Sequence, residues 1–524
     1  MLFHTLPFLI FMLVVLPVFH LLRKTPFWIP WLLSASYLFY GWWNPYYLIL
    51  IVYSTALDYL LVALMDHSPP PDAPKTERKR DAALTSAIVV FSIMGAGLLA
   101  GAAFGPVTLR PTLIAFTFLD LMMALGALLA SRRIWLIVSL INNLTLLLFF
   151  KYARFAVENI NGLLGSRGIH LPDPSTLMPY GSAYVLPVGI SFFTFQSMSY
   201  TIDFYLGKAP RERNILRFAT FVCFFPQLMA GPIERARHML PQFQKAPPFK
   251  LQNLLDGFSL FLVGLFKKLA MANFLSLYVD RVYDNPANAS GSTLVVATIA
   301  FAWQIFFDFS GYTDMARGCA KMMGFELMLN FNNPYLSTGL GEFWTRWHIS
   351  LSSWFRDYVY IPLGGNRRSK LITNRNLFIT FLVSGIWHGA NWNFFIWGGL
   401  HAVGVILTRE LERSEVYRTR VPKIVKQLGV FLYVCFAWIF FRAANVQDAM
   451  LVINRIFHTA WGNPQVPGLM IALVAAVWGY QLAYESRFRK LLGNGYVRVA
   501  IAVSMILYLC LCSSGGGAFI YFQF

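Results

Sequence analysis

His388 lies in the apolar segment SGIWHGANWNFFIWGGLHAVG, in which a second histidine, His401, follows thirteen residues later. An apolar setting disfavours the cationic imidazole, so a ring buried there stays neutral at pH 7 and can accept a proton. Those are the properties of a general base. Gly385 and Gly389 leave room beside the ring for a substrate or for another helix. A hydrogen-bonded core histidine is the competing interpretation, although polar residues inside a membrane commonly mark functional pathways.

A further histidine, His348, belongs to a segment with helical spacing. Large side chains recur at i, i+3, i+4, i+7, i+11 and i+14, namely Trp344, Trp347, His348, Leu351, Phe355 and Tyr358. This period predicts one continuous amphipathic helix with His348 on its packed face, in either a structural or a catalytic role.

The predicted helix runs into the loop IPLGGNRRSK, which carries Arg367, Arg368 and Lys370. These cations suit the phosphates of a carrier such as coenzyme A or phosphopantetheine. A plain cytoplasmic loop of a membrane protein explains them equally well.

The segment QIFFDFSGYTDMARG contains Asp308 and Tyr312, followed by Asp314 and Arg317 at i, i+3 spacing. Two interpretations remain open for these polar groups, namely pairing between helices and lining of a substrate passage. Lys267 and Lys268 end an apolar run, and we expect them to reach the membrane interface.

Other reactive motifs are missing from the sequence. It contains no GxSxG elbow, HExxH pair, P-loop or dinucleotide fingerprint, and its five cysteines form no CxxC. We therefore expect neither a metal site nor a stored cofactor.

The composition defines the kind of protein that positions these residues. Of the 524 residues, 57% are hydrophobic and only 13% are charged, where soluble proteins have about 25% charged residues. The sequence therefore predicts an integral membrane protein. The net charge of +19 lies in short basic clusters between apolar runs, which is typical of cytoplasmic loops and argues against nucleic-acid binding.

Apolar runs of about 20 residues recur along the chain. They predict 11 to 14 helices, with kinks or re-entrant turns at Pro187 and Pro226. The N-terminal run is expected to be an uncleaved first span with its N-terminus outside. The predicted spans are 5–22, 27–42, 46–65, 82–104, 111–130, 134–150, 183–206, 214–232, 253–280, 292–310, 376–408, 428–444, 467–484 and 496–514.

Five blocks of the sequence together resemble the membrane-bound O-acyltransferase (MBOAT) family, and most closely its bacterial alginate O-acetyltransferase branch. They are FFPQLMAGPIER (224–235), FDFSGYTDMARG (307–318), NFNNPYLSTGLGEFWTRWHISLSSWFRDYVYIPLGGNR (330–367), SGIWHGANW (384–392) and the terminal FIYFQF. The resemblance implies one polytopic domain over 1–524 with a catalytic core at 180–445, and residues 82–130 are then two additional helices.

The resemblance also implies a fold and a function. We expect an all-α membrane protein whose helices surround a funnel or tunnel, with His388 at the family's nearly invariant histidine and His348 at its second one. Such proteins move acetyl groups from a cytoplasmic thioester, acetyl-CoA or another, toward polysaccharide outside the bacterial inner membrane. An extracytoplasmic SGNH-hydrolase-like acetyltransferase is the expected partner.

In the mechanism we expect, His388 is the base and His348 orients it or the donor. Asn391 or the indole N–H of Trp387 then binds the oxyanion. Asp308 and Tyr312, together with Arg367 and Arg368, are the candidates for contact with substrate or donor. Two alternatives are a D-alanyl transferase acting on teichoic acid and a polysaccharide or lipid transporter without acyl chemistry.

Overall fold

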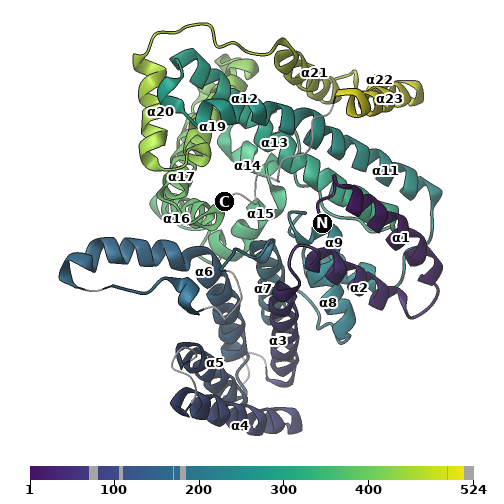
Figure 1. The fold of residues 1–524 in the computed structure, drawn as a ribbon, viewed down its shortest axis with the longest axis vertical. Helices are drawn as coiled ribbons and strands as arrows, with labels where there is room; N and C mark the ends of the chain where they lie inside the picture. Colours follow the sequence, from purple (N-terminus) through teal and green to yellow (C-terminus); the bar gives the residue numbers. More distant parts are fainter. Residues whose placement is uncertain (70–80, 105–109, 169, 178–183, 493, 513–524) are drawn as a thin grey trace. The chain divides into compact units, whose positions relative to one another are not determined.

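The computed structural model describes residues 1–69, 81–104, 110–168, 170–177, 184–492 and 494–512 (Figure 1). All regular elements of these residues are helices, so the predicted all-α membrane fold is confirmed. The FIYFQF block lies outside the described residues. By length and composition, seven of the described helices could cross a membrane: Pro45–His67, Ala82–Ala103, Arg132–Arg167, Leu251–Tyr283, Gly291–Met322, Trp392–Leu411 and Lys423–Arg442.

Contacts divide the chain into two compact units. We call the first the N-terminal unit; it comprises Pro17–Met229 and Ile233–Pro247 together with Met1. The second, the C-terminal unit, comprises Leu2–Leu16, Ala230–Pro232 and Pro248–Phe524. Helix α1 (Leu6–Leu22) contributes residues to both.

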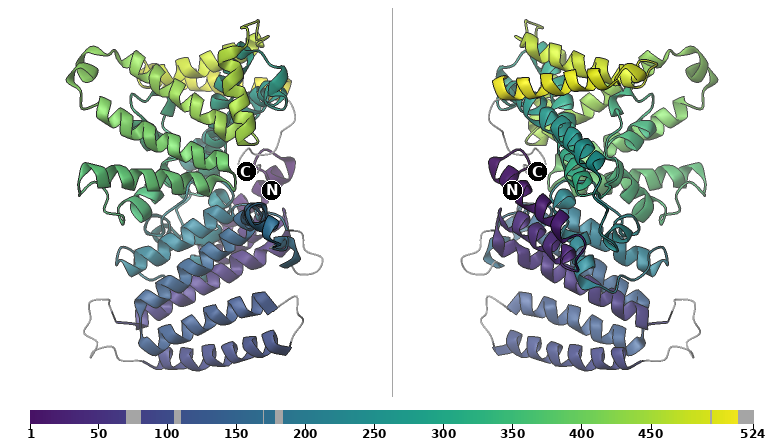
Figure 2. Two further views of the ribbon diagram at one scale, coloured as in Figure 1. Left: turned by 90° about the vertical axis from the view of Figure 1, so that its left-hand side faces the viewer. Right: turned by 90° about the vertical axis from the view of Figure 1, so that its right-hand side faces the viewer.

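The N-terminal unit contains two long helices that were predicted closely. Helix α4 (Ala82–Phe104) has the bounds predicted from its apolar run, and α5 (Arg110–Leu129) lies beside it. Figure 2 shows α4, α5 and α6 as neighbouring rods. The unit also contains α2 (Trp28–Gly41), α3 (Leu48–His67), α6 (Arg132–Leu164), α7 (Ile190–Tyr205), α8 (Ile215–Cys223), α9 (Phe225–Leu228) and α10 (Ala236–Met239).

A buried carboxylate joins α3 and α6 in this unit. Asp58 accepts hydrogen bonds from the Ser139 hydroxyl at 2.6 Å and from the Asn143 amide at 3.0 Å. Hydrogen bonds of this kind satisfy polar groups where lipid offers no water, and they hold neighbouring helices together.

The predicted break in 214–232 is present, because α8 ends at Cys223 and α9 begins at Phe225, directly before Pro226. The span predicted from residue 183 begins later than expected. Helix α7 starts at Ile190, after Pro187 and a left-handed Gly189 with φ of 76°. Proline restricts the residue before it and cannot donate a helical hydrogen bond, so the helix forms only beyond it.

The C-terminal unit is built around α13 (Gly291–Met322), most of whose side chains are buried. Helix α11 (Leu251–Phe266) packs along it (Figure 1). A Cβ atom placed on Gly264 would lie 2.5 Å from the carbonyl oxygen of Gly311, and one on Gly318 would lie 2.6 Å from that of Gly257. Only glycine therefore permits this close approach of two backbones.

Helix α11 continues through a π-helical segment, η7 (Lys267–Ala272), into α12 (Asn273–Tyr283). The predicted span 376–408 is two helices, α16 (Lys370–His388) and α17 (Trp392–Leu411), because Gly389 is extended and Asn391 caps α17. The remaining α- and π-helices of the described residues are α14 (Leu340–Arg346), α15 (Ile349–Phe355), η10 (Arg356–Tyr360), α18 (Glu415–Arg420), α19 (Lys423–Arg442), α20 (Val446–His458), α21 (Gly468–Tyr484), α22 (Arg489–Leu492) and α23 (Gly495–Cys512).

Candidate active site

His388 is the last residue of α16 and is 5% exposed. Its imidazole lies edge-on to three aromatic rings. The ring centroids are 5.0 Å from Trp387, 4.9 Å from Trp397 on α17 and 5.3 Å from Phe441 on α19. The aromatic rings therefore hold the imidazole in an apolar, nearly water-free setting.

The glycines beside His388 serve helix packing. A Cβ atom on Gly385 would collide with the carbonyl oxygen of Phe394, and one on Gly389 would collide with the ring of the same residue. Of the two uses open to these glycines, the structure shows the close approach of another helix, α17.

His348 is fully buried at the start of α15, where it is the N-cap residue in a left-handed conformation with φ of 42° and ψ of 55°. The prediction of one continuous helix from Trp344 to Tyr358 is therefore wrong. Helix α14 ends at Arg346, because the chain here pairs with an earlier segment instead of with itself. The backbone N–H of Ile349 donates to the carbonyl of Asn330 at 2.9 Å, and that of Asn332 donates to the carbonyl of Arg346 at 2.9 Å.

Asn330 orients the His348 ring. Its side-chain oxygen lies 3.2 Å from Nδ1 of His348 and also accepts from the backbone N–H and the hydroxyl of Ser350, at 3.1 and 2.9 Å. The ring of Phe309 lies edge-on at a centroid distance of 4.6 Å. Burial lowers the pKa of His348 to about 3, so this imidazole is neutral at physiological pH.

Trp387 connects the two histidines. Its indole ring is 5.0 Å from the His388 ring and 6.4 Å from the His348 ring, centroid to centroid. His401 belongs to the same aromatic cluster, since its ring lies 4.6 Å from that of Trp397. The structure thus brings His348, His388 and His401 into one buried aromatic cluster within the C-terminal unit.

The side chain of Asn391 caps the N-terminus of α17 and also contacts the backbone of Ala444. Its side-chain oxygen accepts from the backbone N–H of Asn393 at 3.0 Å, and its amide nitrogen donates to the carbonyl of Ala444 at 2.8 Å. Ala444 therefore uses one of the two N–H groups of this amide, and an oxyanion would have to bind the other.

The acidic residues of α13 are paired. Asp308 forms a buried ion pair with Lys268, Nζ to Oδ1, at 2.5 Å, and Asp314 pairs with Lys267 at 2.6 Å and with Arg317 at 3.6 Å. The expectation that both lysines reach the interface is wrong for Lys268, whose side chain is 4% exposed. The π-helical segment η7 turns it toward α13 instead.

The other predicted contact residues lie elsewhere in the unit. Tyr312 is buried on α13, and its ring stacks on that of Phe3 at 4.6 Å. Arg367 and Arg368 are exposed in the loop before α16, and neither forms an ion pair within the described residues. This loop is tied to α16 by Asn376, whose amide donates to the carbonyl of Gly365 at 3.0 Å.

A half-open pocket of about 200 Å³ lies between α14, α15, η10 and α16. One of its walls includes Ser384, which is one helical turn before His388 on α16. Neither His388 nor His348 is among its lining side chains. The residues that line it are Trp344, Leu351, Ser352, Phe355, Arg356, Tyr360, Leu377, Thr380, Phe381 and Ser384.

Sequence reasoning did not identify Asn330 as a partner of His348. The two residues are 18 positions apart, and the backbone pairing of residues 330–332 with residues 346–349 brings their side chains together. No periodicity marks such a contact. In the sequence, Asn330 is only the first residue of the longer block 330–367, and nothing there singles it out.

The apolar helices and the histidines buried among aromatic rings define a multi-pass membrane protein with a cluster of buried histidines. The sequence profile of MBOAT, the membrane-bound O-acyltransferase family, matches residues 178–446. The chain belongs to this family, and it is therefore an O-acyltransferase.

Several curated relatives are similar over most of the chain. The probable alginate O-acetylase AlgI of Azotobacter vinelandii is 35% identical over 466 residues, which cover 86% of this chain and 80% of the relative. The peptidoglycan O-acetyltransferase of Helicobacter pylori is 34% identical over 453 residues, 81% of this chain and 72% of the relative. The teichoic acid D-alanyltransferase of Bacillus subtilis is 30% identical over 270 residues, 48% of this chain and 68% of the relative.

Proposed function

We propose that this protein transfers an acetyl group from a thioester donor toward hydroxyl groups of an extracytoplasmic polysaccharide. The observation that carries the proposal is the enclosure of His388 by Trp387, Trp397 and Phe441. An imidazole in such a setting is a neutral base in a region where water competes little for the acyl group.

In the proposed reaction, His388 removes the proton from an acceptor hydroxyl as its oxygen attacks the thioester carbonyl. The C–S bond of the resulting tetrahedral oxyanion then breaks, and the thiolate takes the proton back from the imidazolium. General base catalysis of this kind contributes about 10² to 10⁴-fold to a rate. His348, held by Asn330, orients Trp387 and through it His388.

Stabilisation of the oxyanion is assigned to an N–H donor beside His388. Trp387 directly precedes it, and its indole ring contacts both histidine rings. Asn391 is the second candidate, although it donates to Ala444 in this structure. A donor preorganised in this way contributes about 10²- to 10³-fold.

The proposed donor is acetyl-CoA or another cytoplasmic thioester. Arg367 and Arg368 are exposed cations without acidic partners among the described residues, as phosphate binding requires. Asp308 pairs with Lys268 and Tyr312 stacks on Phe3, so we propose that both support the fold around the site and not the substrate directly.

The acceptor is inferred from the relatives, two of which are named for O-acetylation of alginate and of peptidoglycan. We propose a bacterial inner-membrane location and an SGNH-hydrolase-like partner that completes the transfer outside. A D-alanyl transferase is the alternative, supported by the shorter match to the Bacillus subtilis protein. Membership of an acyltransferase family favours both over a transporter.

The test is ester analysis by mass spectrometry of envelope polymers from cells with and without the protein, and from cells with His388→Gln or His388→Ala. We expect acetyl esters to disappear in all three strains that lack the native His388. Alanyl esters in their place would favour the alternative. His458→Ala is the matched control, because His458 is an exposed histidine on α20. Unchanged esters in well-inserted His388 variants would remove His388 from the mechanism.

A further inference from the structure

The conformation of the His348 loop, residues 330–350, is intrinsically costly. Its backbone contains two non-glycine residues in the left-handed region, Asn333 with φ of 44° and His348 with φ of 42°. Each costs about 1 kcal/mol or more relative to ordinary backbone. Such a loop keeps one geometry only when contacts outside it hold it there.

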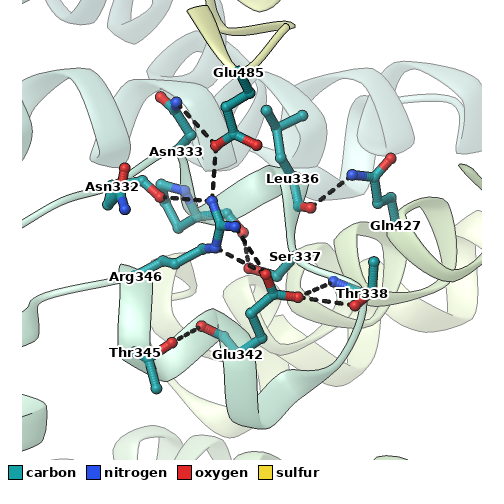
Figure 3. Close-up of polar contacts among 11 residues, drawn as sticks. Asn332, Asn333, Leu336, Ser337, Thr338, Glu342, Thr345, Arg346, Gln427 and Glu485 are labelled. Atoms are coloured by element: carbon teal, nitrogen blue, oxygen red, sulfur yellow. Dashed lines mark hydrogen bonds and ion pairs between the residues drawn. The ribbon is translucent and has the colours of Figure 1, made fainter. Parts of the chain in front are cut away.

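Glu485 supplies such contacts from the end of α21. One of its carboxylate oxygens, Oε1, accepts from Arg346 Nη1 at 2.8 Å and from the amide of Asn333 at 3.2 Å (Figure 3). The backbone pairing beside His348 joins residues 346–349 to residues 330–332. Arg346 belongs to the first of these segments, and Asn333 directly follows the second. A single carboxylate thus joins both sides of the loop.

Arg346 is also fixed from its own helix. It donates to Glu342 through Nε at 3.0 Å and Nη2 at 2.9 Å, and to the carbonyl of Asn332 at 3.3 Å. Burial opposes ionisation of Glu342, but hydrogen bonds from Thr338 and the charge of Arg346 outweigh it and lower its pKa. Glu342 therefore remains an anion, and Arg346 lies between two carboxylates.

The pair between Arg346 and Glu485 is only partly exposed, at 22% and 29% of the two side chains. Charge-assisted hydrogen bonds in such a setting are stronger than those of a fully solvated surface pair. Both contacts of Glu485 are also long-range, since 139 residues separate it from Arg346 and 152 separate it from Asn333.

We propose that Glu485 is a positioning residue for His348, so that the C-terminal helices are part of the active-site framework although they lie outside the family match at 178–446. The inference rests on the proposed catalytic role of the histidine pair. Glu485 touches neither histidine; it acts by holding Arg346 and Asn333, which fix the backbone on either side of the loop.

The experiment compares Glu485→Ala and Glu485→Gln with the wild type in purified, detergent-solubilised full-length protein. Acetyl transfer from acetyl-CoA to an oligosaccharide is measured together with hydrogen–deuterium exchange of residues 330–350. Asp66→Asn is the matched control, because Asp66 forms a partly exposed ion pair of similar length, 3.1 Å, with Arg211, 145 positions later in the N-terminal unit.

We expect kcat to fall about tenfold or more in Glu485→Ala, since small displacements of positioned groups are costly, while KM stays within about twofold. Glu485→Gln keeps the acceptor oxygen and should be intermediate. The amides of Asn332 and Ile349 should exchange faster in Glu485→Ala and be unchanged in the control.

Native kcat and native exchange in Glu485→Ala would overturn the proposal. The proposal would also be overturned if both Glu485 variants showed a lower kcat, a changed KM and a lower melting temperature together. That pattern would indicate general destabilisation of the fold. A third outcome is that the wild-type protein transfers no acyl group while Glu485→Ala still speeds hydrogen–deuterium exchange of residues 330–350. The proposed function and the role of Glu485 in catalysis would then both be wrong. The structural role of Glu485 in holding Arg346 and Asn333 would remain supported.

Discussion

The side-chain oxygen of Asn330 lies 3.2 Å from Nδ1 of His348 and accepts two further hydrogen bonds from Ser350. One buried amide therefore sets both the orientation of the ring and the start of α15. The contacts of Asn330 therefore fix the conformation of the sequence motif around His348.

Replacing Asn330 with Ala should destabilise the protein by about 1–3 kcal/mol, because buried donors of Ser350 lose their acceptor. Acyl transfer should fall more than the loss of folded protein explains. Thermal unfolding and activity at equal folded concentration measure the two effects. Asn288→Ala, at an exposed asparagine that ends the short 3-10 helix Pro286–Asn288, should change neither; a similar loss there would show that the assay reports asparagine removal in general.

The stability of the protein should depend on pH through His348. Its pKa is about 3 in the folded state because of burial, against 6.5 ordinarily. Below pH 6.5 the unfolded chain takes up a proton that the folded chain does not, so stability falls as the pH is lowered from 6.5 toward 3. Between pH 7 and pH 5 the loss should be about 2 kcal/mol.

That contribution should be missing from His348→Gln, whatever the absolute stability of this variant. Unfolding midpoints in denaturant at pH 7 and pH 5 give the difference. Identical pH dependence in the two proteins would show that the folded state protonates His348 as readily as the unfolded one.

The buried pair of Lys268 and Asp308 should be strongly coupled. Lys268→Met alone leaves an uncompensated carboxylate in the protein interior, and we expect a loss of about 3–5 kcal/mol. The double variant Lys268→Met, Asp308→Leu should regain most of it. The exposed pair of Lys321 and Glu326 should show a coupling of about 1 kcal/mol or less in the same double-mutant cycle. Additive effects at 268 and 308 would contradict the pairing.

Replacing Arg367 and Arg368 together with Ala should raise KM for acetyl-CoA by about tenfold or more, since each charge-assisted hydrogen bond to phosphate contributes about 1.5–3 kcal/mol. We expect kcat to change little, because these side chains precede the first residue of α16, whereas His388 is its last residue. Initial-rate kinetics against acetyl-CoA measure the effect. Arg281→Ala, at another exposed arginine, is the control, and an equal rise in KM there would indicate only a general loss of positive charge.

Helix positions in the lipid-facing parts were predictable. The apolar run 82–104 became α4 with the same bounds, and the acyltransferase family was recognisable from short blocks in the right order. A hydrophobic run of about 20 residues is by itself enough to predict a membrane helix. In lipid, the backbone groups of such a run must form hydrogen bonds with one another, and a helix achieves this.

The polar segments were less predictable. A helical period from Trp344 to Tyr358 is interrupted at His348, since backbone pairing with residues 330–332 outweighs the local preference. Lys268 was expected at the interface and is buried against Asp308, 40 positions later. In both cases the decisive partner lies outside the window in which periodicity can be read.

Local hydrophobicity and motif order thus established that this is a multi-pass membrane acyltransferase with His388 and His348 as its candidate histidines. Folding in three dimensions decided that Trp387 contacts both rings, that Asn330 orients one of them and that Glu485 reaches Arg346. The physical reason is that these interactions differ in how far along the chain their partners lie. Hydrophobic burial is additive along a segment and needs no named partner, whereas a hydrogen bond or ion pair requires two particular groups within about 3 Å, which only the folded chain brings together.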